Sequence, residues 1–164
     1  MNESGVKNIA NLINSWHQQG YRVVLATGVF DILHVEHIRF LTKAKSSGDR
    51  LIVGIETDKR VALIKGPDRP VNYELVRLEQ LLALRVVDEA FVLPEKFDSQ
   101  PDWVGFINLI RPDVYAVSSH TSYLDNKRQI CESHGIEFAI VHQFNPSYST
   151  TSLSTKKSAL KDSE

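Results

Sequence analysis

The chain has little of two things that would point to particular classes of protein. Cys131 is the one cysteine among 164 residues, so no disulfide can form within the chain and a reducing compartment is expected. Positive charge is not in excess, because 19 lysines and arginines face 20 aspartates and glutamates, for a formal net charge of −1. A protein without a basic field is not expected to bind nucleic acid or an anionic membrane through bulk charge.

Long apolar runs are also missing. No run approaches the roughly 18 apolar residues of a membrane-spanning helix, and the first residues hold no apolar segment typical of a signal peptide. The sequence therefore predicts a cytoplasmic protein with no membrane partner. Hydrophobic residues make up 42% of the chain, which is enough for one globular domain over residues 1–164.

Apolar patterns with the period of a strand and of a helix alternate along the chain. An N-terminal helix is predicted within residues 1–20, and Gly20 is a natural stop for it. The polar stretch 95–102 is predicted to be a loop, and the charged tail 156–164 is expected to fray. The predicted strands are the apolar runs at 22–27, 51–55, 88–93, 114–117 and 136–141.

This alternation of strands and helices predicts the fold class. A strand, a helix and another strand form a βαβ unit with a parallel, right-handed crossover. Repeating that unit gives an α/β fold: a Rossmann-like, doubly wound sheet of about five parallel strands with helices on both faces. Ligands of such sheets bind beyond the carboxyl ends of the strands, so the loops at 27–31, 118–123 and 145–152 are expected to meet at one site.

A glycine turn followed by two histidines is the stretch with the most chemistry. Gly28 follows the first predicted strand, and His34 and His37 stand three residues apart, a spacing that puts both imidazoles on one face of a helix. A strand that runs into such a turn brings backbone N–H groups and the positive end of a helix dipole to one point, which suits a phosphate. Two half-buried histidines beside an ordinary turn would give the same pattern, so both interpretations remain open at this point.

Three further cations and an asparagine follow in the chain. The segment 65–72 contains two prolines and a glycine, so it cannot be regular structure, and it carries Lys65 and Arg69. Asn72 is expected to cap the next helix, on which Arg77 lies. Taken alone, Lys65 and Arg77 would be interpreted as solvated surface charges.

Several short motifs, taken in order, resemble one family. Residues 27–31 (TGVFD) and 34–37 (HVEH) resemble the G-x-F-D and H-x-G-H signatures of the cytidylyltransferase-like nucleotidyltransferases. The similarity covers about 22–155, and the 65–72 loop is most similar to that of the adenylyltransferase domain of ADP-heptose synthase. Further matching positions are 44–53, Arg77, the pair 87–88 and the S-T-T at 149–151.

The resemblance implies an activity and roles for particular residues. The activity is transfer of AMP or CMP from a nucleoside triphosphate, with ATP preferred, to a phosphorylated sugar or polyol, releasing pyrophosphate. His34 and His37 would hold the phosphates and the transition state, Lys65 and Arg77 would neutralise charge, and Asp31 would brace the turn. Mg²⁺ would arrive with the nucleotide, with no metal site built by the protein. The implied nucleotide-binding residues are Thr27, Gly28, Val29, Phe30, Ser118, Ser149, Thr150 and Thr151.

Three positions depart from the family pattern and keep alternatives open. Glu36 stands in place of the glycine between the histidines, residues 118–120 are Ser-Ser-His, and Phe144-Asn145 precede the S-T-T. Glu36 is expected to face outward, pair with Arg39 and leave the phosphate site open. The alternative is a nucleotide-binding module whose catalysis Glu36 has weakened, and a redox module on a flavodoxin-like sheet is a third hypothesis, which the histidines argue against. The acceptor and the oligomeric state, a homodimer included, stay open.

Overall fold

A five-stranded parallel sheet forms the centre of the molecule, as the sequence predicts. The computed structural model describes residues 3–97 and 99–143, and within them the strand order is β3-β2-β1-β4-β5. Every pair of neighbouring strands is parallel. The strands are β1 (Val23–Gly28), β2 (Arg50–Ile55), β3 (Glu89–Val92), β4 (Val114–Ser118) and β5 (Glu137–His142).

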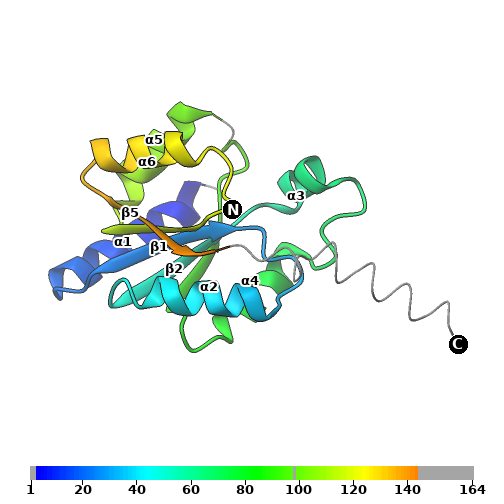
Figure 1. Cartoon of the computed structure of the whole chain (residues 1–164), viewed down its shortest axis with the longest axis horizontal. Coiled ribbons are helices and arrows are strands. Elements are labelled where there is room, and N and C mark those ends of the chain that lie inside the picture. The colour runs from blue at the N-terminus through cyan, green and yellow to red at the C-terminus, as the bar shows by residue number, and fades with distance from the viewer. Residues whose placement is uncertain (1–2, 98, 144–164) are drawn as a thin grey trace, which may run out of the picture.

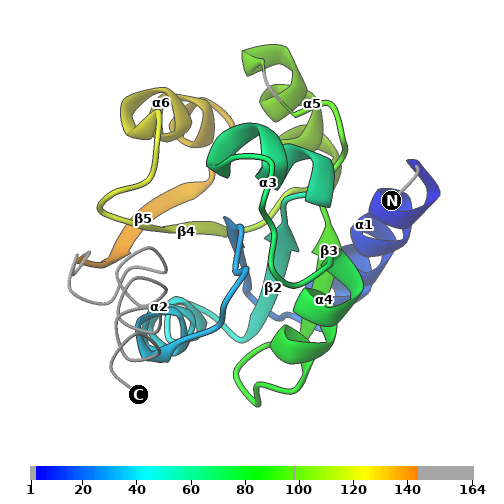
Figure 2. The ribbon, with the colours of Figure 1, turned by 90° about the vertical axis from the view of Figure 1, so that its right-hand side faces the viewer.

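Helices cover both faces of this sheet. Along β1, Val23 and Leu25 pack into one hydrophobic cluster while Val24 and Ala26 pack into the other, because successive side chains of a strand point to opposite faces. One face carries three helices and the other carries two, as Figures 1 and 2 show. The first set is α1 (Glu3–Gln18), α5 (Gln100–Ile110) and α6 (Leu124–Ser133), and the second is α2 (Val35–Lys45) and α4 (Glu74–Leu82).

The start of α5 corrects the prediction of a loop over 95–102. The Ser99 side chain accepts a hydrogen bond from the backbone N–H of Asp102, and the Asp102 carboxylate accepts one from the backbone N–H of Ser99. This reciprocal capping box begins the helix three residues before its first large apolar side chain, Trp103. The apolar pattern therefore places the body of the helix, whereas the polar cap sets its first residue.

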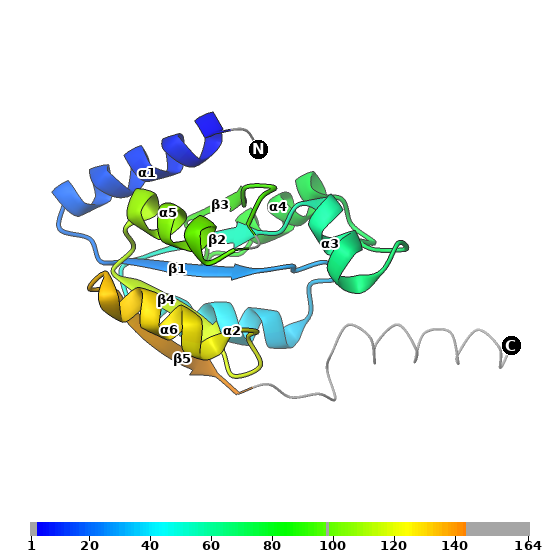
Figure 3. The same cartoon turned by 90° about the horizontal axis from the view of Figure 1, so that it is seen from above.

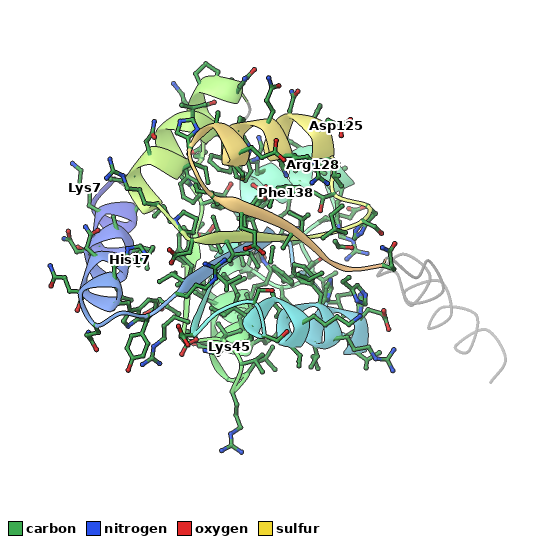
Figure 4. All side chains as sticks on the ribbon, turned by 60° about the vertical axis from the view of Figure 1, so that its left-hand side comes forward. Lys7, His17, Lys45, Asp125, Arg128 and Phe138 are labelled. Atoms are coloured by element: carbon green, nitrogen blue, oxygen red, sulfur yellow. The ribbon has the colours of Figure 1, made fainter. Side chains whose placement is uncertain are left out.

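Helix α6 and the edge strand β5 are joined by a contact between a cation and an aromatic ring. The Arg128 guanidinium lies 4.7 Å from the centre of the Phe138 ring, and both side chains are labelled in Figure 4. Such a contact stabilises the pair by about 0.5–1 kcal/mol at a partly exposed site. It helps to hold α6, and the cavity residues on it, against the sheet.

The short helix α3 (Asp58–Lys65) lies beyond the carboxyl ends of the strands, apart from both layers (Figure 3). Its N-cap is Thr57, whose side chain accepts a hydrogen bond from the backbone N–H of Arg60. The helix ends at Lys65, so its length places that cation above the sheet. Among the described residues, none of the helices is both long and apolar enough to cross a membrane.

Candidate active site

A cavity of about 840 Å³ opens at the carboxyl ends of the strands. Strand β1 lies between β2 and β4, so the order of the strands reverses here, and ligands of such folds bind at this reversal. The loops that follow β1 and β4 both reach the cavity, as predicted. Of the candidate residues, those that line it are Thr27, Gly28, Val29, Phe30, His34, His37, Lys65 and Ser118.

The turn after β1 needs glycine at position 28. A Cβ atom there would lie 2.8 Å from Cε2 of the Phe30 ring, closer than real contacts allow. Phe30 itself has a φ of 48°, in the left-handed region that non-glycine residues seldom adopt. This backbone folds the Phe30 ring back under the turn, where it meets the His37 ring edge-on with 5.2 Å between ring centres. Gly28 therefore supports His37 through Phe30.

His34 and His37 stack on each other. Their ring centres are 3.8 Å apart with 23° between the ring planes. His37 lies in the first turn of α2, whereas His34 is the N-cap with extended backbone, one residue before the helix rather than within it. The Nδ1 atoms of both are buried and have no hydrogen-bond partner among the described residues. Both histidines also line the cavity, so the faces of their rings that are not buried are available to a ligand.

Burial and neighbouring charge keep this pair neutral at pH 7. Burial lowers the pKa of His37 to about 3, and the charges of His34, Lys65 and His120 add to that shift, while the Ile32 carbonyl opposes it. Burial also lowers the pKa of His34, and Lys65 adds to the shift, although Glu36 acts in the opposite direction. A neutral imidazole has one N–H to donate and becomes a stronger donor when it gains a proton. The pair can therefore respond to negative charge in the cavity.

The Asp31 carboxylate ties the turn after β1 to the segment between Lys65 and α4. Its buried carboxylate accepts hydrogen bonds from Arg69 Nη1 at 2.6 Å and from the backbone N–H groups of Val71 at 2.8 Å and Asn72 at 2.9 Å. Burial raises the pKa of Asp31, but these donors outweigh it and the pKa is lowered. Asn72 does not cap α4, because its amide donates to the Asp31 carbonyl at 2.5 Å and Tyr73 is the N-cap.

Arg77 does not lie where a contact with substrate charge would need it. It is on α4, none of its surface is exposed, and it does not line the cavity. Its guanidinium donates to the carbonyls of Val29 at 2.8 Å, Glu56 at 2.9 Å and Asn72 at 3.0 Å, and to the Asp58 carboxylate at 2.7 Å. The expected role as a direct neutraliser of substrate is corrected to a structural one. Arg77 holds together the segments that follow β1 and β2.

Glu36 points along the sheet rather than outward, which corrects the expectation that it faces solvent. The predicted ion pair with Arg39 is present, and Glu36 Oε2 also accepts a hydrogen bond from His142 Nε2 at 3.0 Å. Only 11% of the Glu36 side chain and 10% of the His142 side chain are exposed. Burial raises the pKa of Glu36, but the bonds from Arg39 and His142 outweigh it and lower the pKa. Glu36 therefore connects the first turn of α2 to the end of β5 while lining the cavity.

The remaining predicted positions divide between the cavity and the part of the chain that is not described. Thr27 Oγ1 and the Tyr115 hydroxyl are 2.7 Å apart, which joins β1 to β4 at the cavity floor. Ser118 Oγ lies 2.7 Å from His120 Nδ1, and both residues line the cavity. Positions 144–145 and 149–151 lie outside the described residues.

Known proteins with similar sequences belong to the family that the motifs at this site resemble. Residues 25–157 match the family model described as cytidylyltransferase-like. The chain belongs to this family. It is 43% identical over 107 residues to the bifunctional protein HldE of Methylobacillus flagellatus, which covers 65% of the chain and 21% of that protein. The HldE protein of Sulfurimonas denitrificans is 42% identical over 109 residues, covering 66% and 22%. The chain thus spans about a fifth of the length of these relatives.

Solved structures show the same fold. A lipopolysaccharide core biosynthesis protein from Thermoplasma volcanium has a TM-score of 0.63 and 28% identity, over 77% of this chain and 98% of that one. A pantoate-beta-alanine ligase from Francisella tularensis has a TM-score of 0.64 over 87% of this chain and 67% of that one, at 17% identity, which supports the fold alone. Membership of the cytidylyltransferase-like family gives no support to the redox hypothesis.

The described residues can be searched for a set of metal ligands. Among the described residues there is no group of three or more histidine, cysteine, aspartate or glutamate side chains that could hold a metal ion. The imidazoles of His34 and His37 and the ammonium of Lys65 line the cavity. Mg²⁺ commonly binds through substrate phosphates with few protein ligands, so these residues are compatible with Mg²⁺ entering on the triphosphate.

The contribution of Lys65 to nucleotide binding can be tested by titration. Burial lowers the pKa of Lys65, Arg69 adds to that shift and Asp31 opposes it, which leaves the ammonium at the cavity wall. We expect Lys65→Ala to weaken binding of ATP and CTP by about tenfold at low salt, and by less at high salt, because salt screens an exposed charge. Calorimetric titration at two ionic strengths measures this. Equal affinity of Lys65→Ala and the wild type at both would remove Lys65 from the site, and Lys43→Ala, an exposed lysine on α2, is the matched control.

Glu36→Gly restores the glycine that the family pattern has at this position, and so tests how Glu36 affects nucleotide binding and stability. The change removes a negative charge from the cavity wall and also removes the link to His142, so the two effects on nucleotide binding oppose each other. We expect nucleotide affinity to change by less than about tenfold, and the midpoint of thermal unfolding to fall by about 2–4 °C because glycine weakens a helix. A gain well above tenfold in affinity or turnover would show that Glu36 blocks the site. Glu36→Gln removes the charge and one of the two acceptors but keeps the shape of the side chain, so it separates the loss of charge from the loss of the side chain.

The cavity residues that were missed from the sequence include Glu56, Arg60, Trp103 and Lys127. Glu56 directly follows β2, and a charged residue at that position of a parallel sheet points to the ligand edge. Glu56 could therefore have been found from the sequence. Trp103 and Lys127 could not be found in this way, because they reach the cavity from two helices that meet only in the fold.

Proposed function

We propose that this chain transfers AMP or CMP from a nucleoside triphosphate to the phosphate of a sugar or polyol, with ATP preferred, and releases pyrophosphate. An oxygen of the acceptor phosphate attacks the α-phosphorus, the new P–O bond forms in line, and the bond to the bridging oxygen of pyrophosphate breaks. The preference for ATP rests on the 65–72 loop, which resembles that of an adenylyltransferase domain.

The observation that carries this proposal is the stacked, neutral histidine pair beside the Gly28 turn. In-line phosphoryl chemistry asks the protein mainly for positioning and for stabilisation of charge. His34 and His37 would donate to the phosphate oxygens as charge builds up around the α-phosphorus. Lys65 would attract the triphosphate, and the backbone N–H groups of the turn would hold its oxygens.

Magnesium would enter with the nucleotide. When bound to the phosphate oxygens it neutralises part of their charge. The protein residues would do the rest: they orient the triphosphate, supply the N–H donors and keep water from the α-phosphorus. The alternative of a module without catalysis finds no support in the position of Glu36, because Arg39 and His142 already satisfy its carboxylate.

Pyrophosphate release tests the proposal. ATP or CTP with Mg²⁺ would be incubated with a panel of sugar and polyol phosphates, and pyrophosphate would be measured through an inorganic pyrophosphatase and phosphate detection. We expect release that requires both the nucleotide and an acceptor, with a nucleoside-diphosphate product visible by mass spectrometry. Nucleotide binding without release, across the whole panel, would favour the module without catalysis.

A further inference from the structure

Strand β5 contains a bulge next to the cavity. The strand pairs with β4 in regular register as far as Ile140. The next pair joins Ser118 to His142, so Val141 is an extra residue on β5. Bulges of this kind change the direction of the side chains that follow them, and they are over-represented next to active sites.

The bulge turns His142 toward α2. Phe138 packs into the hydrophobic cluster on the face of α1, whereas Val141 packs into the cluster on the face of α2. Strict alternation from Phe138 would send His142 to the face of α1. Instead its ring meets the Phe40 ring of α2 edge-on, with 6.5 Å between centres, and its Nε2 lies 3.0 Å from Oε2 of Glu36. The irregular strand end therefore aims His142 at Glu36.

The carboxylate of Glu36 is held at the cavity and can accept further hydrogen bonds. Glu36 lines the cavity, and 11% of its side chain is exposed. Its Oε1 accepts from Arg39 and its Oε2 from His142, so each oxygen has one described donor. A carboxylate has about four lone-pair sites, which leaves about two for a ligand. Arg39 does not line the cavity, so a ligand there need not displace it.

The position of Glu36 indicates which part of a nucleotide it meets. It stands between His34 and His37 in the chain, and the proposed function places the α-phosphate at that histidine pair. The ribose is joined directly to the α-phosphate, whereas the base lies beyond the ribose. The pKa of Glu36 is lowered, so its carboxylate is ionised at pH 7. Two neighbouring hydroxyls are suitable donors to it, because hydrogen bonds with an ionised partner are the stronger ones.

We propose that Glu36 recognises the ribose of the nucleotide by accepting hydrogen bonds from its 2′- and 3′-hydroxyls, while His142 holds the carboxylate in place. This inference rests on the proposed nucleotidyl transfer. The family pattern has glycine at this position, and glycine has no side chain to offer to a ribose. The contact therefore depends on the residue by which this chain departs from the pattern. It makes Glu36 a residue that selects ribonucleotides over deoxyribonucleotides.

A nucleobase fits the Glu36 carboxylate less well. The base is further from the histidine pair along the nucleotide than the ribose is. Only bases with an amino group could donate to the carboxylate, so such a contact would depend on which base is present. A contact with the ribose is instead the same for every nucleotide. Nucleotides that differ by one hydroxyl or by the base therefore distinguish the two arrangements.

Calorimetric titration of ATP, CTP and their 2′-deoxy, 3′-deoxy and 2′,3′-dideoxy forms with Mg²⁺ tests the assignment. We expect the wild type to bind each 2′-deoxy or 3′-deoxy form about tenfold more weakly than its parent, because one hydroxyl that donates to a charged group is missing. In Glu36→Gln and Glu36→Gly this deoxy penalty should fall below about threefold, because the charged acceptor is gone. Glu36→Gly should bind 2′,3′-dideoxy-ATP more tightly than the wild type does, since a negative charge leaves the cavity and no hydroxyl contact is lost.

His142→Phe tests whether His142 positions the carboxylate. Phenylalanine keeps a ring against Phe40 but cannot donate to Glu36, so the deoxy penalty should fall to about threefold because a less fixed acceptor binds less well. The affinity for 2′,3′-dideoxy-ATP should stay close to that of the wild type. The matched control is Glu132→Gln, which changes an exposed acid on α6 outside the cavity and should keep the full penalty. Thermal unfolding shows that each variant is folded at the temperature of the titration.

Two results would overturn the inference directly. One is equal affinity of the wild type for ATP and its deoxy forms, and the other is a penalty that Glu36→Gln and Glu36→Gly both keep. A variant effect seen with ATP but not with CTP would place the base at Glu36, and would overturn the inference as well. A penalty unchanged in His142→Phe would show that His142 does not position the carboxylate.

The inference and the proposed function fail in different ways. The titrations do not require turnover, so a deoxy penalty that depends on Glu36, in a protein that releases no pyrophosphate with any acceptor, would retain the ribose contact and remove the transfer. Pyrophosphate release from a protein without a deoxy penalty would do the reverse. Absence of binding of every nucleotide to the wild type would overturn both.

Discussion

His37→Ala should lower kcat by about 10²–10³-fold, the usual result of removing one donor to charge that develops in a transition state. His37 lies beside the Gly28 turn, its Nδ1 has no partner among the described residues, and its ring is stacked on His34. A donor in that position acts mainly when the α-phosphorus is crowded with oxygen atoms, so KM for nucleotide should change far less than kcat. His34→Ala should behave in the same way, and pyrophosphate release measures both.

The pH dependence of unfolding provides a second readout for His37. Its pKa is lowered from 6.5 to about 3 in the folded protein, so the unfolded chain binds a proton below pH 6.5 that the native state does not take up. This contribution to stability is therefore complete above the unfolded pKa of about 6.5 and is lost as the pH falls toward 3. His37→Ala should lose less stability than the wild type between pH 7 and pH 4.5 in denaturant titrations.

His134→Ala, which changes an exposed histidine after α6, is the control and should alter neither turnover nor this pH slope. If His34→Ala and His37→Ala both kept near wild-type rates on an accepted substrate, the stacked pair would have to be structural. If His37→Ala kept the wild-type turnover but changed the pH dependence of unfolding, His37 alone would have to be structural.

Local pattern is enough to predict the sheet and much of the cavity. Strands such as Leu51–Ile55 have β-branched, apolar sequences that hardly fit any other element, and all five predicted strands lie in the described sheet within two residues. His34 and His37 meet as their short separation in sequence predicts, although His34 is the N-cap and lies just outside the helix. Lys65 reaches the cavity because a short helix with a clear N-cap ends there. In each case the interacting residues are close in sequence.

Contacts between distant residues account for what the sequence did not predict. Glu36 turns toward His142, which is 106 residues away, and no local rule favours that direction over solvent. Asn72 bonds to the Asp31 backbone instead of capping α4, because the braced loop brings a carbonyl within its reach. Glu36 was expected to point to solvent because it stands between two inward-facing histidines, but its carboxylate bonds to His142 on the edge strand instead.

Arg77→Met should lower the free energy of unfolding by about 3–5 kcal/mol, the usual cost of breaking a buried ion pair from one side. Methionine has a similar length, so the change removes the charge and the donors with little loss of volume. It leaves three partly buried carbonyls and the Asp58 carboxylate without the guanidinium that now joins them. Chemical denaturation with a fixed slope measures the loss, and Arg85→Met, at an exposed arginine after α4, should cost less than about 1 kcal/mol.

The same variants distinguish a structural Arg77 from one that contacts substrate. Arg77→Lys should be nearly as destabilising as Arg77→Met, because an ammonium is a point charge that cannot bond to four acceptors held in the plane of a guanidinium. At a temperature where the variants remain folded, nucleotide binding should show no added dependence on salt, since Arg77 does not line the cavity. Wild-type stability combined with a salt-sensitive loss of nucleotide affinity would instead assign Arg77 to the substrate, and a rearrangement of α4 on binding would then be required.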